Sequence, residues 1–372
     1  MKIVFDARVL GKNIHGIARY CLNLLHQLLA EDRGDEYLIL INQSKIQEWF
    51  TPQVSVRWLS TSIPLYGLQE QILIPIHLRR EAFDLFHSPT FTIPLLFSPK
   101  GIMTIHDLIP MIFPEDYGLG HRLFFQFVVR QAVARCLRVF TVSERSRKDI
   151  ITLLQGREDR LAITPNGLDP HWGPKPEDPE WNRRYQLDQG YLVFVGNPKP
   201  HKNFFRVLSA FELLIKDNSY PGKLVAIGIP PGNLSADLKD RVLFLPECND
   251  QDLSLFYSGA ELLVAPSLYE GFGLPVLEAM ACGCPILIGN QGALPEIAGD
   301  AGFVVNPYDI HAIKEGIREI LLHQDLRQDL RERGLKQAKQ YSWEKTARIV
   351  LETYDSLKKK KQNPGVRIQN SE

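Results

Sequence analysis

The chain has 372 residues and a formal net charge of zero, with 44% apolar and 23% charged residues. This length favours two domains, and the composition is ordinary for a soluble globular enzyme. Because the net charge is zero, nucleic acid has no overall electrostatic attraction to the protein, and no nucleic-acid partner is expected.

The cysteines and the apolar runs limit the class of protein further. The cysteines form no Cys-x-x-Cys pair and no Cys/His cluster, which argues against a disulfide framework and structural zinc. No apolar run reaches the length of a membrane span, and the N-terminus lacks a signal-peptide hydrophobic region, so we expect a cytoplasmic protein. The five cysteines are Cys21, Cys136, Cys248, Cys282 and Cys284.

The chain begins with a predicted strand, a glycine-bearing loop and a helix. Residues 3–5 are apolar and predict a buried strand, and a polar loop follows over residues 8–15. From residue 17 to about residue 30, apolar residues recur at helical spacing. Gly16 stands at the start of this helix, where free backbone N–H groups favour an anion. The loop lacks a full Gly-x-Gly-x-x-Gly motif, and a helix N-cap glycine explains Gly16 equally well.

Later strands of the first half end in histidines. The predicted strand at residues 101–105 is followed directly by His106. Ligands of open α/β sheets bind at the carboxyl ends of strands, so His106 is a candidate site residue. The alternative is a histidine whose ring is satisfied by local backbone. His87, near the end of another strand, is a weaker candidate and is expected to be structural or on the side of a second substrate.

A predicted helix over residues 123–137 combines aromatic residues with arginines. A basic amphipathic helix can lie on anionic lipid, so peripheral contact with an anionic membrane is one interpretation. A core helix with solvated arginines is the favoured alternative. The arginines are Arg122, Arg130, Arg135 and Arg138.

A proline-rich, charged segment at residues 173–179 separates two series of alternating strands and helices. We therefore expect one domain over residues 1–182 and a second over 183–340, with a last helix at 341–360 returning to the first. The second series opens with a strand at 192–195, followed by Gly-Asn-Pro-Lys-Pro-His-Lys-Asn. Lys202 in this segment would supply a mobile positive charge beside an anion site, or else be a solvated lysine.

The longest motif covers residues 270–284 and lies between predicted buried strands at 262–265 and 286–288. Pro275 suits the first turn of a helix and Gly283 suits its end, so the segment predicts a strand–loop–helix–strand unit of a parallel sheet. The loop Gly-Phe-Gly at 271–273 precedes the helix N-terminus, which is a natural anion site. Glu270 opens the loop, and Glu278 lies one turn into the helix.

This Glu-x7-Glu motif, with Pro-Asn-Gly-Leu-Asp at 165–169, resembles the retaining nucleotide-sugar glycosyltransferases of the GT-B fold. That family includes sucrose synthases, glycogen synthases and bacterial mannosyltransferases and glucosyltransferases. The resemblance extends from Gly16 to Thr346. It implies an α/β fold with two Rossmann-like domains whose parallel sheets face a central cleft, and a C-terminal helix that crosses back to the first domain.

The resemblance also implies the reaction. A hexose would pass from a nucleoside diphosphate sugar to a glycan, a lipid-linked acceptor or a small molecule, with retention at the anomeric carbon. No metal and no other cofactor is implied. Guanosine diphosphate mannose and uridine diphosphate glucose are the leading donors, with mannose slightly ahead. The expected location is cytoplasmic, with peripheral contact to the inner membrane face left open.

Roles for individual residues follow from the same resemblance. The catalytic candidates are His106 facing the donor sugar, Lys202 on the diphosphate and Glu270 on the sugar hydroxyls. Glu278 would contact the ribose, and Gly16 would approach the donor diphosphate or sugar. His201 stands where the family usually has arginine, which leaves the second cation on the diphosphate open. The other substrate-binding candidates are Asn197, Lys199, Pro246, Gly271, Phe272, Gly273 and Leu274.

Three other interpretations remain at this point. A nucleotide-sugar 2-epimerase or a phosphorylase can have the same fold, and a non-catalytic nucleotide-sugar-binding protein would bind a donor without turnover. A metal-dependent glycosyltransferase would carry Asp-x-Asp, which Asp250-Gln251-Asp252 matches, although aspartates at a helix start are expected as caps. The lysine run at 358–361 is interpreted as a solvated, frayed end with a minor prospect of membrane contact.

Overall fold

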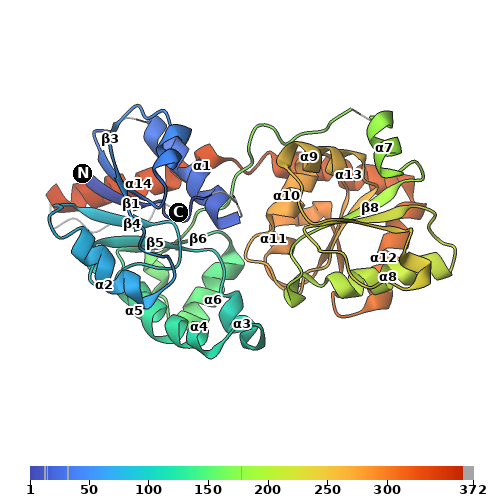
Figure 1. Ribbon diagram of the computed structural model, residues 1–372, viewed down its shortest axis with the longest axis horizontal. Coiled ribbons are helices and arrows are strands. Elements are labelled where there is room, and N and C mark those ends of the chain that lie inside the picture. Colours follow the sequence, from blue (N-terminus) through green and yellow to red (C-terminus); the bar gives the residue numbers. More distant parts are fainter. Residues whose placement is uncertain (12–13, 15, 32, 177, 363–372) are drawn as a thin grey trace. The chain divides into compact units, whose positions relative to one another are not determined.

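The computed structural model describes residues 1–11, 14, 16–31, 33–176 and 178–362. It contains two compact units, each built around one parallel sheet (Figure 1). The first unit is Met1–Gly167 together with the chain from Ser342, and the second is Leu168–Tyr341. Lys12, Asn13 and His15 of the expected first loop lie outside the described residues.

The first unit ends earlier than the Asn182 expected from the sequence, because the proline-rich segment packs on the second unit. The backbone N–H of Lys175 donates to the hydroxyl of Ser258 at 3.0 Å. The ring of Trp172 lies 6.0 Å from that of Tyr257. The segment that the composition suggested as a linker is therefore part of the second unit's fold.

The first unit has a seven-stranded sheet with the strand order β3-β2-β1-β4-β5-β6-β7, and every neighbouring pair is parallel. The order reverses direction between β1 and β4, which makes this the topological switch point of the sheet. The strands are β1 (Lys2–Asp6), β2 (Glu36–Ile41), β3 (Ser55–Ser60), β4 (Leu85–Ser88), β5 (Gly101–Ile105), β6 (Arg138–Thr141) and β7 (Leu161–Ile163).

Helices cover both faces of this sheet, as expected for parallel strands that are buried on both sides. The helix expected over residues 123–137 is a run of three pieces whose middle one is a π-helix, η4. The helices are α1 (Gly16–Ala30), α2 (Leu68–His77), α3 (Ile109–Ile112), α4 (Leu119–Leu123), η4 (Phe124–Val129), α5 (Arg130–Arg135) and α6 (Glu144–Leu154). Short 3-10 turns are η1 (Ser44–Trp49), η2 (Ser98–Lys100), η3 (Pro114–Asp116) and η5 (Glu158–Arg160).

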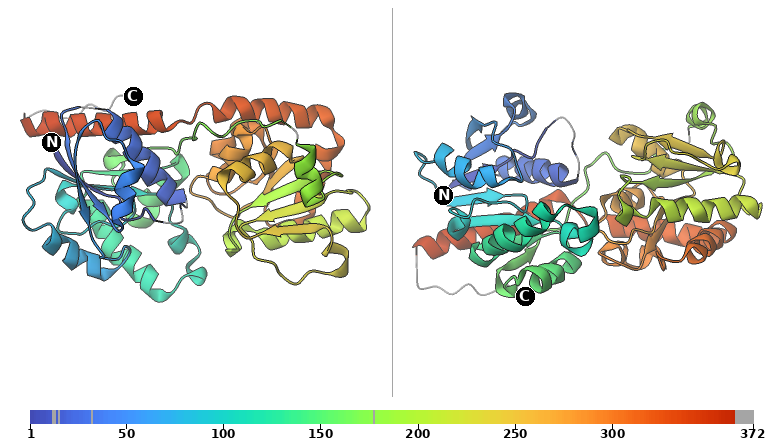
Figure 2. Two further views of the ribbon diagram at one scale, coloured as in Figure 1. Left: turned by 45° about the horizontal axis from the view of Figure 1, so that its top comes forward. Right: turned by 60° about the horizontal axis from the view of Figure 1, so that its bottom comes forward.

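The last helix, α14 (Trp343–Gln362), belongs to the first unit and packs beside α1 (Figure 2). The hydroxyl of Tyr354 and Nδ1 of His87 are 2.5 Å apart in the core. The expectation of a crossing C-terminal helix is confirmed. The expectation of a frayed lysine end is wrong, because the helix continues through the lysines and Lys358 Nζ pairs with Asp35 at 2.7 Å.

The second unit has a six-stranded parallel sheet in the order β10-β9-β8-β11-β12-β13, with its switch point between β8 and β11. The strands are β8 (Tyr191–Val195), β9 (Lys223–Ile227), β10 (Val242–Leu245), β11 (Leu262–Ala265), β12 (Ile286–Gly289) and β13 (Gly302–Val305). The helices are α7 (Pro179–Tyr185), α8 (Phe204–Lys216), α9 (Asp250–Gly259), α10 (Leu274–Ala281), α11 (Leu294–Ala298), α12 (Ile310–Leu322) and α13 (Gln324–Ala338). Short 3-10 turns are η6 (Pro200–Lys202), η7 (Ala236–Leu238) and η8 (Gly299–Ala301).

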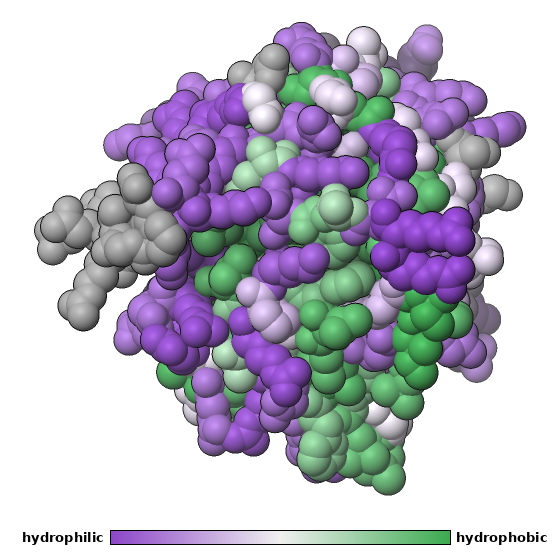
Figure 3. Space-filling view, turned by 90° about the vertical axis from the view of Figure 1, so that its left-hand side faces the viewer, coloured by the Kyte–Doolittle hydropathy of each residue, from purple (hydrophilic) through white to green (hydrophobic). Residues whose placement is uncertain are grey.

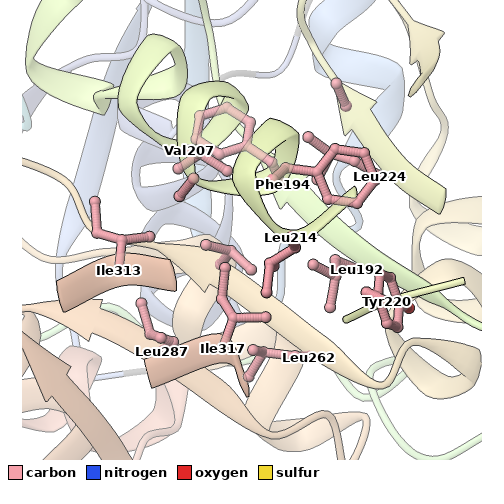
Figure 4. Packing of buried hydrophobic residues seen from close by; sticks show 14 of the residues in the cluster. Leu192, Phe194, Val207, Leu214, Tyr220, Leu224, Leu262, Leu287, Ile313 and Ile317 are labelled. Carbon is pink, nitrogen blue, oxygen red and sulfur yellow. The ribbon is translucent and has the colours of Figure 1, made fainter. Parts of the chain in front are cut away.

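The core of the second unit forms where α8 and α12 cover one face of the sheet (Figure 4). Val207 and Leu214 of α8 and Ile313 of α12 pack on strand residues such as Leu192 and Leu262, all almost fully buried. Burial of side chains of this kind contributes about 1.5–3 kcal/mol each. This packing fixes the strands, and therefore the loops at their carboxyl ends.

Candidate functional site

The loops after β8, β11 and β13 are tied together at the carboxyl edge of the second unit's sheet. The backbone N–H of Leu268 donates to the carbonyl of His201 at 2.7 Å. The side-chain amide of Asn203 donates to the carbonyls of Pro266 at 2.8 Å and Pro307 at 2.6 Å. Asn203 has a φ of 66°, in the left-handed region that asparagine tolerates better than most residues. One buried asparagine thus holds three loops around the switch point.

At this switch point, Lys202 and Glu270 form an ion pair. Lys202 Nζ donates to Oε1 of Glu270 at 2.7 Å and to Oε2 at 2.9 Å. The hydroxyl of Ser267 donates to Oε1 at 2.8 Å. The two charged side chains keep only 16% and 12% of their surface exposed. A cation and a carboxylate predicted from motifs far apart in sequence are therefore brought together.

Glycines allow the backbone around Glu270 to pack closely. Gly273 precedes α10 with a φ of +106°, and Gly292 has a φ of +68°. A Cβ on Gly292 would lie 2.6 Å from the backbone nitrogen of Glu270, so no other residue fits there without a shift. The carbonyl of Glu270 accepts from the N–H of Ala293 at 3.0 Å. The loop after β12 therefore supports Glu270 directly.

Glu278 lies within α10 and is buried. Its Oε2 accepts from the hydroxyl of Tyr257 in α9 at 3.4 Å. Burial, and next the neighbouring Glu278 carboxylate, raise the pKa of Tyr257 well above its usual value, so its hydroxyl stays a donor. Glu278 thus has a structural partner, and its contact with a ribose stays a prediction.

The remaining candidates of the second unit lie on loops at the same sheet edge. Asn197 and Lys199 are exposed after β8, and Oδ1 of Asn197 accepts from the N–H of Lys199 at 3.2 Å. Pro246 is exposed after β10, the edge strand, which is separated from β8 by β9. Phe272 is buried against Tyr341, with ring centroids 5.7 Å apart. Gly271 and Leu274 flank this phenylalanine and the helix N-terminus.

In the first unit, His106 follows β5 and is almost buried. Its Nε2 lies 2.9 Å from the carbonyl of Pro89, so this nitrogen carries the proton. Its ring lies edge-on to Tyr20 at 4.8 Å. The backbone contact is the one that the alternative interpretation of His106 expected. Gly16 is exposed at the first position of α1.

His87 is a core residue. It is fully buried, and burial lowers the pKa of its ring to about 3. A neutral ring that is held by Tyr354 from α14 has a structural role, one of the two roles expected for it.

The aspartate pair Asp250 and Asp252 lies in the first turn of α9. The cap itself is Asn249, whose Oδ1 accepts from the N–H of Asp252 at 2.8 Å. Among the described residues, no group of three or more His, Cys, Asp or Glu side chains could hold a metal ion. The aspartates therefore support the start of a helix.

Sequence reasoning did not single out Ser267, Asn203 or Tyr257 as parts of this site. Asn203 stands next to Lys202 in a motif that was noted, so its position was available as a signal. Ser267 and Tyr257 lie in ordinary sequence, and only the folded loops give them Glu270 and Glu278 as partners.

Two family profiles match the chain, one on each half. The family described as Glycosyl transferases group 1 matches residues 178–337. The family described as Glycosyltransferase Family 4 matches residues 14–172. These matches cover the loops that carry Lys202, Glu270 and His106.

Relatives in sequence cover most or almost all of the chain. O-antigen chain mannosyltransferase B of Escherichia coli is 30% identical over 384 residues, which cover 96% of this chain and all of that protein. Serotype-specific mannosyltransferase WbdA of Escherichia coli is 28% identical over 73% of this chain, and that match spans 36% of WbdA.

Solved structures of low sequence identity share the fold. Sucrose-phosphate synthase from Thermosynechococcus elongatus superposes with a TM-score of 0.76 at 18% identity, over 96% of this chain and 98% of that one. Anabaena HepE in complex with UDP and glucose gives 0.74 at 16% identity, over 96% and 100%.

Two α/β units, each with a parallel sheet and a switch point, define the GT-B fold that these solved structures share. The chain belongs to the group 1 and family 4 glycosyltransferases, and it is a retaining hexosyltransferase that uses a nucleotide-sugar donor.

Proposed function

We propose that this enzyme transfers mannose from a nucleoside diphosphate donor to a growing glycan or a lipid-linked acceptor, with glucose as the alternative sugar. The cluster of Lys202, Glu270 and Ser267 at the switch point carries the proposal. The relatives named as mannosyltransferases of the O-antigen chain support mannose and a bacterial surface glycan.

In this proposal the charges of the cluster divide between the two parts of the donor. Negative charge grows on the leaving diphosphate during transfer, and the Lys202 ammonium together with the N-terminus of α10 would stabilise it. Glu270 would accept hydrogen bonds from hydroxyls of the donor sugar, and His106 would face that sugar. Lys202 and Ser267 both hydrogen-bond to Glu270 and hold its carboxylate in place. A carboxylate held in this way suits the positioning of the donor sugar better than nucleophilic attack on it.

The test is a donor panel with the purified enzyme. Guanosine diphosphate mannose should be turned over with release of guanosine diphosphate, slowly to water alone and faster with an acceptor glycan. Conversion of the donor into its 2-epimer would instead identify an epimerase. Donor binding without release of nucleotide from any sugar of the panel would identify a binding protein.

We also propose that the first unit contacts an anionic membrane through one apolar surface. In α2, Leu68, Ile72 and Ile76 recur every four residues and are exposed, while Ile74 is buried. The same spacing recurs in the second helical run. Its exposed residues are Leu119, Leu123 and Phe127. We call these six side chains the apolar surface.

The two helical runs rest on one core. Ile74 of α2 and Phe125 of η4 belong to the same buried cluster. Between the runs, the N–H of Leu95 donates to Gln71 of α2 at 2.9 Å, and the neighbouring Leu96 is exposed. Figure 3 shows apolar residues gathered in the lower part of the face in which α2 lies. A contiguous exposed patch of this kind marks an interaction site.

Charges beside the apolar surface favour lipid as its partner. Arg79 and Arg80 directly follow α2, Arg122 and Arg135 belong to the second helical run, and all four are exposed, whereas Arg138 donates to the carbonyl of Asp159 at 2.9 Å. Exposed arginines near apolar side chains suit an anionic bilayer. No helix in the described part of the chain is long and apolar enough to cross a membrane. We propose a cytoplasmic enzyme that binds peripherally to the inner face of the membrane.

Vesicle sedimentation tests this contact with matched variants. Phe127 and Leu322, the latter in the second unit, are both 66% exposed. Phe127→Asp should lose binding to phosphatidylglycerol vesicles, and Leu322→Asp should keep it. Equal binding by both variants, or binding to phosphatidylcholine alone of the same strength, would contradict the proposal.

A further inference from the structure

Tyr66 stands in an unusual backbone conformation near the switch point of the first unit's sheet. Its φ is 63°, in the left-handed region that a bulky residue rarely adopts. The loop that carries it runs from the end of β3 to α2. Left-handed conformations at non-glycine residues cost about 1–3 kcal/mol and concentrate at functional sites. A conformational outlier at this edge of the sheet therefore calls for a functional explanation.

A buried arginine holds this loop in place. Arg8 follows β1 and donates through Nη1 to the carbonyls of Ile63 at 3.1 Å and Pro64 at 3.4 Å. Its other nitrogens donate to Asp6 at 2.6 and 2.7 Å and to Glu70 at 3.3 Å. All three charged side chains are almost fully buried. The loop is therefore fixed by the ends of the elements that form the switch point.

The ring of Tyr66 is supported on one face by Phe91, and the residue is partly exposed. It stacks on Phe91 with centroids 4.7 Å apart and an interplanar angle of 13°, and Phe91 in turn lies 4.8 Å from Phe125. Even so, Tyr66 keeps 40% of its surface exposed. A rigid, exposed aromatic ring offers apolar area and an electron-rich face, which suit the C–H groups of a pyranose ring.

Phe91, the stacking partner of Tyr66, lies on the same short loop as Pro89, which contacts the predicted catalytic histidine. Pro89, whose carbonyl is 2.9 Å from Nε2 of His106, is two residues from Phe91. Both follow β4, the strand beside β1 at the switch point. A sugar ring on Tyr66 would therefore lie on the same edge of the sheet as His106.

We propose that Tyr66 is a stacking platform for a pyranose ring of the acceptor. The proposal rests on the transferase function above, since only an acceptor sugar needs a second carbohydrate site apart from the donor loops of the other unit. The platform would bind the ring by its apolar face and leave its hydroxyl edge free. Its backbone support by Arg8 and its stack on Phe91 would hold it rigid before the acceptor arrives.

Saturation-transfer NMR with methyl α-D-mannopyranoside and methyl α-D-glucopyranoside tests the platform. Wild type and Tyr66→Phe should transfer saturation to the ring protons of at least one glycoside. Tyr66→Asn should lose that signal, while asparagine tolerates the left-handed backbone and keeps the loop. Trp49→Ala is the matched control, because Trp49 of η1 is 41% exposed and should not affect the signal.

The outcomes separate this proposal from the proposed function. Titration with guanosine and uridine diphosphates should give the same affinity in every variant. If the wild-type enzyme did not turn over any donor, the transferase function would be refuted. Normal donor turnover with no glycoside signal in the wild type, or with a signal that survives in Tyr66→Asn, would overturn the platform alone.

Discussion

Replacing Glu270 by glutamine should strengthen the binding of a nucleoside diphosphate. In the structure Lys202 is engaged by both oxygens of Glu270, so an incoming diphosphate competes with this carboxylate for the ammonium group. Two unit charges 2.7 Å apart attract by about 6 kcal/mol at an effective dielectric constant of about 20. Desolvation offsets most of this, and couplings within one network of charged groups are about 0.5–3 kcal/mol.

We therefore expect Glu270→Gln to gain about 1–2 kcal/mol, or about 5- to 30-fold, in affinity for guanosine or uridine diphosphate. Transfer of the sugar should meanwhile fall by orders of magnitude, because an interaction expressed in the transition state is lost. The assay is isothermal titration of the diphosphates and the free nucleosides, paired with a transfer assay.

The control is the same change in a Lys202→Met background, where the gain should disappear because no ammonium group is left to release. Nucleoside affinity should stay unchanged in all variants. Weaker diphosphate binding by Glu270→Gln, or an equal gain for the free nucleosides, would refute the competition between the carboxylate and the diphosphate.

Three further predictions concern the glycine that packs against Glu270, the buried histidine of the first unit and the independence of transfer from metal ions. Gly292→Ala should lower the rate of transfer at least about tenfold, because the added Cβ forces a shift of the Glu270 backbone. The control is Gly299→Ala, which is also at positive φ but faces only the flexible side chain of Gln337, and which should lose stability without a comparable loss of rate. Equal losses of rate in the two variants would contradict this prediction. The pKa of His87 is about 3 in the fold and 6.5 when the ring is exposed, so only the unfolded chain takes up a proton between these pH values. The wild type should therefore lose up to about 1.4 kcal/mol of stability per pH unit as the pH falls from 6.5 towards 3. In thermal unfolding, the stability of His87→Asn should depend less on pH in that window. Transfer should persist after treatment with a chelator, and a complete loss that magnesium or manganese restores would reverse the expectation of a metal-independent reaction.

The sequence determined the alternation of strands and helices and the position of the main motif. The runs at 262–265 and 286–288 became β11 and β12 (Ile286–Gly289), and Pro275 lies in the first turn of α10 as expected. These features are local, because apolar periodicity reports burial of one element and proline or glycine acts on its own backbone. The same alternation also predicted that each half of the chain contains its own parallel sheet.

Only the tertiary structure decided which side chains become partners in hydrogen bonds and ion pairs. Lys202 and Glu270 are 68 positions apart, and their ion pair exists because β8 and β11 are neighbours at the switch point. The outer face of α4 and η4 could not be read from the sequence, because apolar residues occur on both sides of that run and only packing shows which side is buried. Likewise the lysines at 358–361 looked like a free end until Asp35, far away in the chain, provided a partner for Lys358. A sequence pattern reports the periodicity of one segment, whereas hydrogen bonds and ion pairs depend on which segments the fold brings within a few ångströms of each other.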